Sequence, residues 1–239
     1  MRRPLLRLAI AAAAAMLIDA PALAARAAPL ALGSDIGRTA LILTLLALVP
    51  TILVSMTSFV RIVVVLSMVR HAFGMPETPP NVVLVSLALF LTAFTMSPTM
   101  SAINRDALQP MLAGRIGVEP AVDAGSRPLR TFMLAQTRDQ DIESIYAISR
   151  TPVPARPDQV EMLKLAPAFI INELRVSFTI GFIILLPFLL IDLVVSSILL
   201  SLGMMMVPPT TISLPIKLLM FVLIDGWRLV LEGVLGSFR

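Results

Sequence analysis

The 239-residue sequence contains no cysteine, one histidine, one tryptophan and one tyrosine. The absence of cysteine excludes disulfides, thiol catalysis and cysteine-ligated metal sites. With a single histidine, the sequence offers no cluster of metal ligands and no catalytic nucleophile paired with a general base. It also contains no glycine-rich phosphate-binding loop. We therefore interpret the chain as a protein that is not an enzyme, with no cofactor and no bound metal.

Charged residues are also scarce, at 14% of the chain, and they form no basic block. The formal net charge of +4 is spread along the sequence, which argues against nucleic acid as a partner. Apolar residues account for 57% of the chain, and the mean hydropathy of +0.91 is too high for a soluble domain of this size. This composition indicates a membrane protein.

The first residues are typical of a secretory signal peptide. Three arginines precede an apolar run at residues 8–18, which is too short to span a bilayer, and small residues follow at Ala22 and Ala24. We expect cleavage of residues 1–24, with an alternative end at residue 27 and an uncleaved anchor as the other alternative. Such a signal implies a bacterial envelope and a mature N-terminus outside the cytoplasm.

Four long apolar segments follow, at residues 39–60, 78–104, 176–202 and 211–235. About 20 apolar residues cross a bilayer as a helix, so the segments predict an all-α membrane protein. Pro50 and Pro187 lie inside two segments, and Pro98 and Pro215 lie near the ends of the others. Each proline removes a backbone donor and favours a kink or break. Because freed carbonyls need protein or a wet cavity around them, proline-broken helices in an assembly fit better than a simple four-span anchor.

A charged stretch separates the second apolar segment from the third. Residues 98–170 carry both signs of charge and the only tyrosine, which indicates a small water-exposed domain, with a helix expected at 127–149. We therefore expect a helical hairpin at 39–97, a periplasmic domain at 98–170 and a second hairpin at 171–239. With the mature N-terminus outside, residues 61–81 are expected to form a cytoplasmic linker.

A methionine-rich septet joins the last two apolar segments. Its residues are Gly203, Met204, Met205, Met206, Val207, Pro208 and Pro209. Glycine frees the backbone and the prolines end any helix, so the three thioethers can face one way, whereas helical neighbours are ~100° apart. Methionine is apolar, flexible and polarizable, which suits a surface that seals and deforms. Several copies around an axis would form a soft ring; the alternative is a turn with methionine as filler.

Charges inside the apolar segments need a partner or water, because an ionised side chain costs at least ~2.5–3.5 kcal/mol at a bilayer centre. Asp192 stands within the third segment, and Glu173 lies just before it. The fourth segment carries four charges. If the segment were a single helix, with ~100° of rotation per residue, all four would lie on one side of it. These are Lys217, Asp225, Arg228 and Glu232. Lys217 is a candidate partner for Asp192 or for Glu173. Such pairs are expected to fix helix register in an assembly, and the alternative is a proton or ion path.

Several stretches together resemble one known family. They are MTSFVRIVVVLS at 56–67, TPPN at 78–81, LALFLT at 87–92, residues 132–133 and 136–138, PAFIINEL at 167–174, and the septet at 203–209. In these stretches the chain resembles the FliP family of flagellar biosynthetic proteins, which has counterparts in the injectisomes of type III secretion. The signal peptide and the sizeable extramembrane domain favour the flagellar branch, with an injectisome export gate subunit as the alternative.

The resemblance implies a pore-forming subunit that passes unfolded flagellar proteins across the bacterial inner membrane. It implies a homopentamer that joins FliQ and FliR in a helically arranged export gate, beside FlhA and FlhB at the flagellar basal body. Met204, Met205 and Met206 would then form a gasket around the export channel. An ion-coupled secondary transporter, in which Asp192 and Lys217 carry the coupling, is the alternative from a different class.

The resemblance also implies roles for residues outside the septet. Glu173, Asp192 and Lys217 match charged positions that hold subunits together in the family. Phe132 matches an aromatic position implicated in periplasmic closure or assembly. A second such aromatic falls near Tyr146, where the match is less complete.

Overall fold

The computed structural model describes residues 39, 43, 44, 47, 50–52, 54–74 and 77–238. Backbone contacts divide the chain into two units, Met1–Pro50 and Thr51–Arg239, and the fold below is that of the second unit. The expected signal peptide at 1–24 and residues 40–42, 45, 46, 48, 49 and 53 of the first apolar segment lie outside the described residues.

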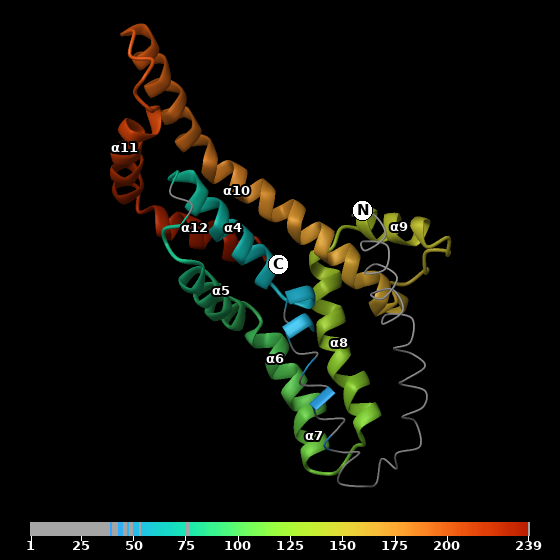
Figure 1. Cartoon of the computed structure of the whole chain (residues 1–239). Helices are drawn as coiled ribbons and strands as arrows, with labels where there is room; N and C mark the ends of the chain where they lie inside the picture. Colours follow the sequence, from blue (N-terminus) through green and yellow to red (C-terminus); the bar gives the residue numbers. More distant parts are fainter. Residues whose placement is uncertain are drawn as a thin grey trace, which may run out of the picture. The chain divides into compact units, whose positions relative to one another are not determined.

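All regular elements in the described part of the second unit are helical, which confirms the all-α prediction (Figure 1). Residues 51, 52 and 54–56 are helical. The elements that follow are, in chain order, α4 (Phe59–Ala72), α5 (Asn81–Thr95), α6 (Ser97–Ile103), the π-helical turn η1 (Asn104–Leu108), α7 (Gln109–Leu112), α8 (Val118–Gln136), α9 (Asp139–Ile148), the 3₁₀ turn η2 (Pro157–Gln159), α10 (Met162–Ser201), α11 (Pro209–Leu223) and α12 (Gly226–Leu235).

Helix α10 is the one helix in the described residues that is long and apolar enough to cross a membrane by itself. The stretches Asn81–Thr95 and Ser97–Leu112 reach the required length only as a pair bent by 63°, and α11 is apolar but shorter. The number of crossings therefore stays a prediction.

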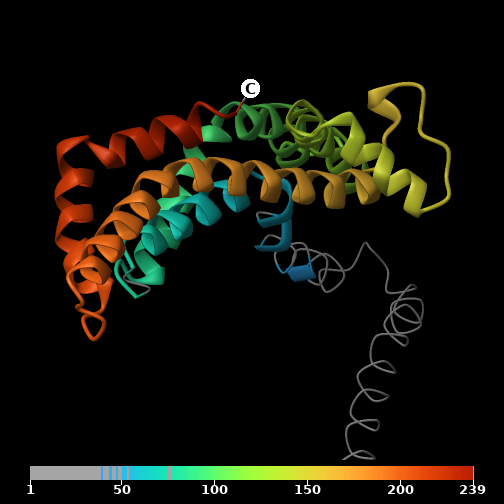
Figure 2. The same cartoon turned by 90° about the horizontal axis from the view of Figure 1, so that it is seen from above.

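Helix α10 runs for 40 residues and passes Pro167 and Pro187 without a break. Pro187 was expected to kink or break its helix, and no break occurs there. A proline removes only its own N–H from the helix ladder, and long helical runs on both sides compensate for that loss. Figure 2 shows that α10 curves along its length instead of breaking.

The first apolar core is built around α4. Its most buried side chains are Ile62, Val65, Leu66 and Val69, each at most 1% exposed. Helix α4 lies beside α10 and α5 (Figure 1). Phe188 of α10 and Ala88 of α5 belong to the same cluster of buried residues as this face. Residues 61–72 are therefore part of a core helix and not of the linker expected at 61–81; the side of the membrane on which they lie stays a prediction. The i, i+3, i+4, i+7 spacing of these apolar residues is that of a core-facing helix.

The second apolar core joins α8, α9 and the start of α10. Its buried members are Met133, Ile142, Tyr146, Val160, Leu165, Ala168 and Phe169. The helix expected at 127–149 is split here, because Thr137 and Arg138 have extended backbone and separate α8 from α9. The domain boundary expected at residue 170 lies inside α10, which is continuous from Met162–Ser201.

The fourth apolar segment forms two helices instead of one. Helix α11 ends at Leu223, α12 begins at Gly226, and Asp225 between them is left-handed with φ 51°. Gly226 fits the turn because a Cβ added there would lie 2.1 Å from the ring of Phe221. This turn changes the direction of the chain before the charged residues of α12.

Candidate functional site

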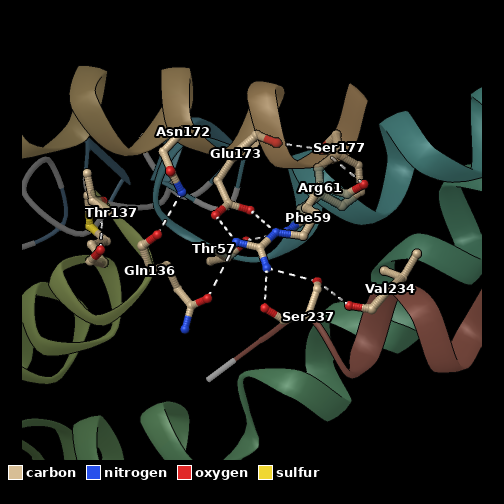
Figure 3. A network of polar contacts seen from close by, with 11 residues as sticks. Thr57, Phe59, Arg61, Gln136, Thr137, Asn172, Glu173, Ser177, Val234 and Ser237 are labelled. Carbon is tan, nitrogen blue, oxygen red and sulfur yellow. Dashed lines mark hydrogen bonds and ion pairs between the residues drawn. The ribbon is translucent and has the colours of Figure 1, made fainter. Parts of the chain in front are cut away.

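A buried ion pair joins α4 to α10. Arg61 is 1% exposed and Glu173 is 0% exposed. Arg61 Nε donates to Glu173 Oε2 at 2.8 Å and Nη2 donates to Oε1 of the same carboxylate, so the pair is bidentate (Figure 3). The two residues are 112 positions apart in the chain, and no local pattern in the sequence connects them.

The remaining donors of Arg61 reach the C-terminal segment and α8. Nη1 donates to the carbonyl and to the hydroxyl of Ser237, both at 2.9 Å, and Nη2 donates to Gln136 Oε1 at 3.4 Å (Figure 3). The ring of Phe238 lies 4.0 Å from the guanidinium carbon. Asn172 of α10 donates to the carbonyl of Gln136 at 2.7 Å. The pair therefore connects α4, α8, α10 and the end of the chain.

Lys217 of α11 pairs with Asp192 of α10 and not with Glu173. Its Nζ lies 2.6 Å from Asp192 Oδ2 and also donates to the backbone carbonyl of Ala72 at 3.0 Å. Asp192 accepts a second bond from the hydroxyl of Ser213 at 2.7 Å. Ala72 is the last residue of α4, so the ammonium group satisfies a carbonyl that the end of that helix leaves unpaired. One lysine thus connects α4, α10 and α11.

Two further pairs were not foreseen. Asp141 of α9 and Arg175 of α10 form a bidentate pair at 2.6 and 2.7 Å. On α12, Arg228 and Glu232 pair at 2.8 Å and are 71% and 58% exposed, whereas Lys217 is only 4% exposed. The single charged face predicted for the fourth segment is therefore wrong, because the turn between α11 and α12 separates its members.

The methionine septet forms the turn of the α10–α11 hairpin, beyond the end of α4 (Figure 1). The exposed fractions are 44% for Met204, 81% for Met205 and 95% for Met206. Gly203, with φ 73°, follows the end of α10 in a conformation that favours glycine. Pro208 precedes α11 and Pro209 is its first residue, a position where the missing N–H has no consequence. All three thioethers are thus presented to the outside of the chain.

The arms of this hairpin also expose large apolar side chains. On α10, Leu190, Leu193 and Leu200 are 62%, 64% and 67% exposed, and on α11, Val222 and Leu223 are each 75% exposed. Soluble monomers rarely leave contiguous apolar surface of this kind uncovered. These faces therefore require lipid or other protein chains as neighbours.

Phe132 and Tyr146 both lie at the second core. Tyr146 is 2% exposed, and its hydroxyl accepts the backbone N–H of Glu161 at 3.2 Å. Phe132 meets Phe169 edge to face with centroids 6.0 Å apart and stacks on Phe238 at 6.5 Å. Phe132 therefore touches the same aromatic ring that covers the buried guanidinium group. The expected role of these two aromatics in closure or assembly stays a prediction.

The site offers charge pairs and apolar surface instead of reactive groups. Within the described residues, no three His, Cys, Asp or Glu side chains gather in a way that could hold a metal ion. His71 is exposed in the last turn of α4, with Nδ1 2.6 Å from the carbonyl oxygen of Ser67. The ion pairs thus hold a scaffold that positions an exposed apolar tip.

Comparison with known proteins gives consistent matches over this fold. The model of the FliP family matches residues 42–234. The flagellar biosynthetic protein FliP of Pectobacterium carotovorum subsp. carotovorum is 48% identical over 201 residues, covering 84% of this chain and 78% of that protein. That of Caulobacter vibrioides is 43% identical over 245 residues, covering 100% and 92%, and that of Bacillus subtilis is 46% identical over 198 residues, covering 83% and 90%. The chain belongs to the FliP family.

Proposed function

We propose that this chain is a pore-forming subunit of the flagellar type III protein export gate, which passes unfolded flagellar proteins across the bacterial inner membrane. The observation that carries the proposal is the hairpin tip, where Met204, Met205 and Met206 are exposed together on a turn bounded by glycine and proline. The names of the curated relatives, flagellar biosynthetic proteins, support the flagellar setting.

In the proposed gate five copies of the chain meet around the channel. FliQ and FliR complete the assembly, and FlhA and FlhB lie beside it at the flagellar basal body, with residues 98–170 on the periplasmic side. The exposed apolar faces of α10 and α11 support this arrangement, because they need neighbouring chains or lipid. Within each subunit, the pair of Asp192 with Lys217 keeps α11 in register with α10, and the pair of Arg61 with Glu173 holds α4 against α10.

The proposed seal follows from the chemistry of methionine. A ring of thioethers and methyl groups offers no strong hydrogen bond to water or ions, so a narrow apolar constriction stays dry when it is empty. Each methionine side chain has three rotatable bonds and changes rotamer easily, so the ring yields when a polypeptide passes. A ring of rigid β-branched side chains would deform less easily.

The seal is tested by replacing Met204, Met205 and Met206 together with alanine. We expect the complex to assemble and purify as the wild type does, but vesicles that contain it should leak small ions. Met100→Ala is the matched control, because Met100 is as exposed as Met204, at 44% each, but lies on α6. Unchanged ion permeability in the triple variant would contradict the seal.

The conduit is tested by a photo-activatable cross-linker at Met205, the central residue of the tip. During active export we expect it to capture flagellar substrate polypeptides in transit. Capture of lipid alone would contradict the proposal.

The partly buried pair of Asp192 and Lys217 favours one other candidate, an ion-coupled secondary transporter. In a transporter, Asp192→Asn should abolish ion coupling in a protein that still assembles normally. In the export gate the same variant should lose assembly. An injectisome gate is distinguished by the deletion phenotype, which would be lost effector secretion instead of lost motility.

A further inference from the structure

The methionines of the chain fall into distinct environments. Met205 and Met206 at the hairpin tip are 81% and 95% exposed, whereas Met96 and Met133 are 1% and 0% exposed. A thioether is oxidised to a sulfoxide by peroxides and hypohalous acids, and exposure of the sulfur strongly affects how fast this happens. In the single chain, Met205 and Met206 are therefore the most exposed methionines among the described residues, and Met204, 44% exposed, lies beside them.

The backbone of the tip maintains this exposure. Gly203 is left-handed, with φ 73°, and the N–H of Met204 donates to the carbonyl of Leu199 at 2.9 Å, which closes the end of α10. Pro208 has extended backbone before α11 begins. Because the backbone is constrained at both ends of the turn, the three methionines lie between the two helices and belong to neither.

We propose that Met204, Met205 and Met206 form a reversible oxidation site of this protein. A sulfur lone pair attacks one oxygen of hydrogen peroxide, the O–O bond breaks, an S–O bond forms, and the other oxygen leaves as water. The sulfur is oxidised by two electrons and the peroxide is reduced. In the reverse step a thiol-dependent methionine sulfoxide reductase returns the sulfoxide to the thioether, and its two thiols become a disulfide with release of water.

The consequence of the modification rests on the proposed function. A sulfoxide is polar and accepts hydrogen bonds, so an oxidised ring would be hydrated where the reduced ring is dry. Residues 202–213 contain no lysine or arginine that could pair with the new sulfoxide oxygens. Oxidation therefore converts the proposed seal into a leak until the reductase restores it.

The chemistry is tested on the purified export complex, or on membranes that contain it, treated with hydrogen peroxide. Peptide mass spectrometry measures sulfoxide at each methionine over time. We expect Met205 and Met206 to oxidise at least about tenfold faster than Met96 and Met133, and a reductase with dithiothreitol to reverse the change. Equal rates at the exposed and buried positions, or protection of the tip in the assembled complex, would overturn the proposal.

The consequence is tested separately by ion leakage before and after peroxide. The matched variant replaces Met204, Met205 and Met206 with leucine, which is apolar and does not form a sulfoxide. We expect peroxide to increase leakage through the wild-type complex and to have no such effect on the leucine variant. Sulfoxide formation at the tip without any change in leakage would leave the oxidation site standing and refute the seal. Leakage that rises equally in both proteins would refute the link between them.

Discussion

Replacing Glu173 by glutamine is the sharpest perturbation of the buried scaffold. Glutamine keeps the size and shape of the side chain and one acceptor oxygen, but it removes the negative charge. The guanidinium of Arg61, 1% exposed, then stays in the interior without a counterion. Since the pair lies inside one chain, the effect should appear in the stability of the single subunit.

The expected loss follows from the burial of both groups. Removal of one partner of a buried pair destabilises a protein by about 3–5 kcal/mol, because the remaining charge is not compensated. Arg61 would keep its bonds to the Ser237 oxygens and to Gln136, so we expect the lower end, about 3 kcal/mol. That corresponds to a decrease of roughly 100-fold in the folding equilibrium constant.

The matched control is Glu161→Gln. Glu161 also pairs with a basic side chain, Lys164 at 3.1 Å, but it is 61% exposed, and a pair of that kind contributes at most about 1 kcal/mol. The free energy of unfolding of each full-length variant is measured by denaturant titration in detergent. The fluorescence of Trp227, the only tryptophan, reports on α12.

Equal stability of the Glu173→Gln and Glu161→Gln variants would refute the reasoning. A double variant, Arg61→Met with Glu173→Leu, should recover most of the lost stability, because an apolar pair of similar volume removes the buried charge altogether. If Glu173→Gln left the subunit stable and abolished assembly alone, Glu173 would act between subunits.

Two further substitutions test the close contacts of the backbone. Gly181→Ala should be less stable than Gly233→Ala by about 1 kcal/mol. An added Cβ at Gly181 meets the sulfur of Met68 at 2.3 Å and its Cβ at 3.1 Å, and the flexible thioether can move away whereas the Cβ is fixed to α4; at Gly233 an added Cβ meets nothing within 4 Å. Equal unfolding free energies in denaturant would contradict the tight α4–α10 contact. Asp225→Val should lower the free energy of unfolding by about 1–2 kcal/mol, because a β-branched residue is strained at φ 51°, whereas Asp225→Gly should stay within about 1 kcal/mol of the wild type. A pair of Asp225 variants with the same thermal midpoint would show that the left-handed turn does not form.

The predictions made from local patterns were mostly correct. Apolar composition and long uncharged segments predicted helices, and every element in the described part of the second unit is helical. The glycine and prolines around the methionines predicted a turn, and the turn lies between α10 and α11. The argument that buried charges need partners also holds for Glu173, Asp192 and Lys217, each of which has one. Each of these features depends only on the residue itself or on a few residues next to it, so the sequence alone is enough to predict it.

The predictions that failed depend on contacts between distant segments. Residues 61–72 follow the first apolar segment and were expected to belong to a linker, but packing against α10 makes them the central helix of the first core. Pro187, expected to kink or break its helix, lies inside the continuous α10, and Asp225, which was expected inside a helix, marks the turn that separates α11 from α12.

The sequence by itself determined that this protein is helical and apolar, that a constrained turn presents three thioethers, and that its inner charges must be neutralised. Only the tertiary structure decided which charges meet, because Arg61 and Glu173 are 112 positions apart and Lys217 had two candidate partners. The physical reason is that conformation within a few residues follows from their own backbone preferences. Pairing across the chain depends on which helix faces bury the most apolar surface together, and this is settled by all the helices at once.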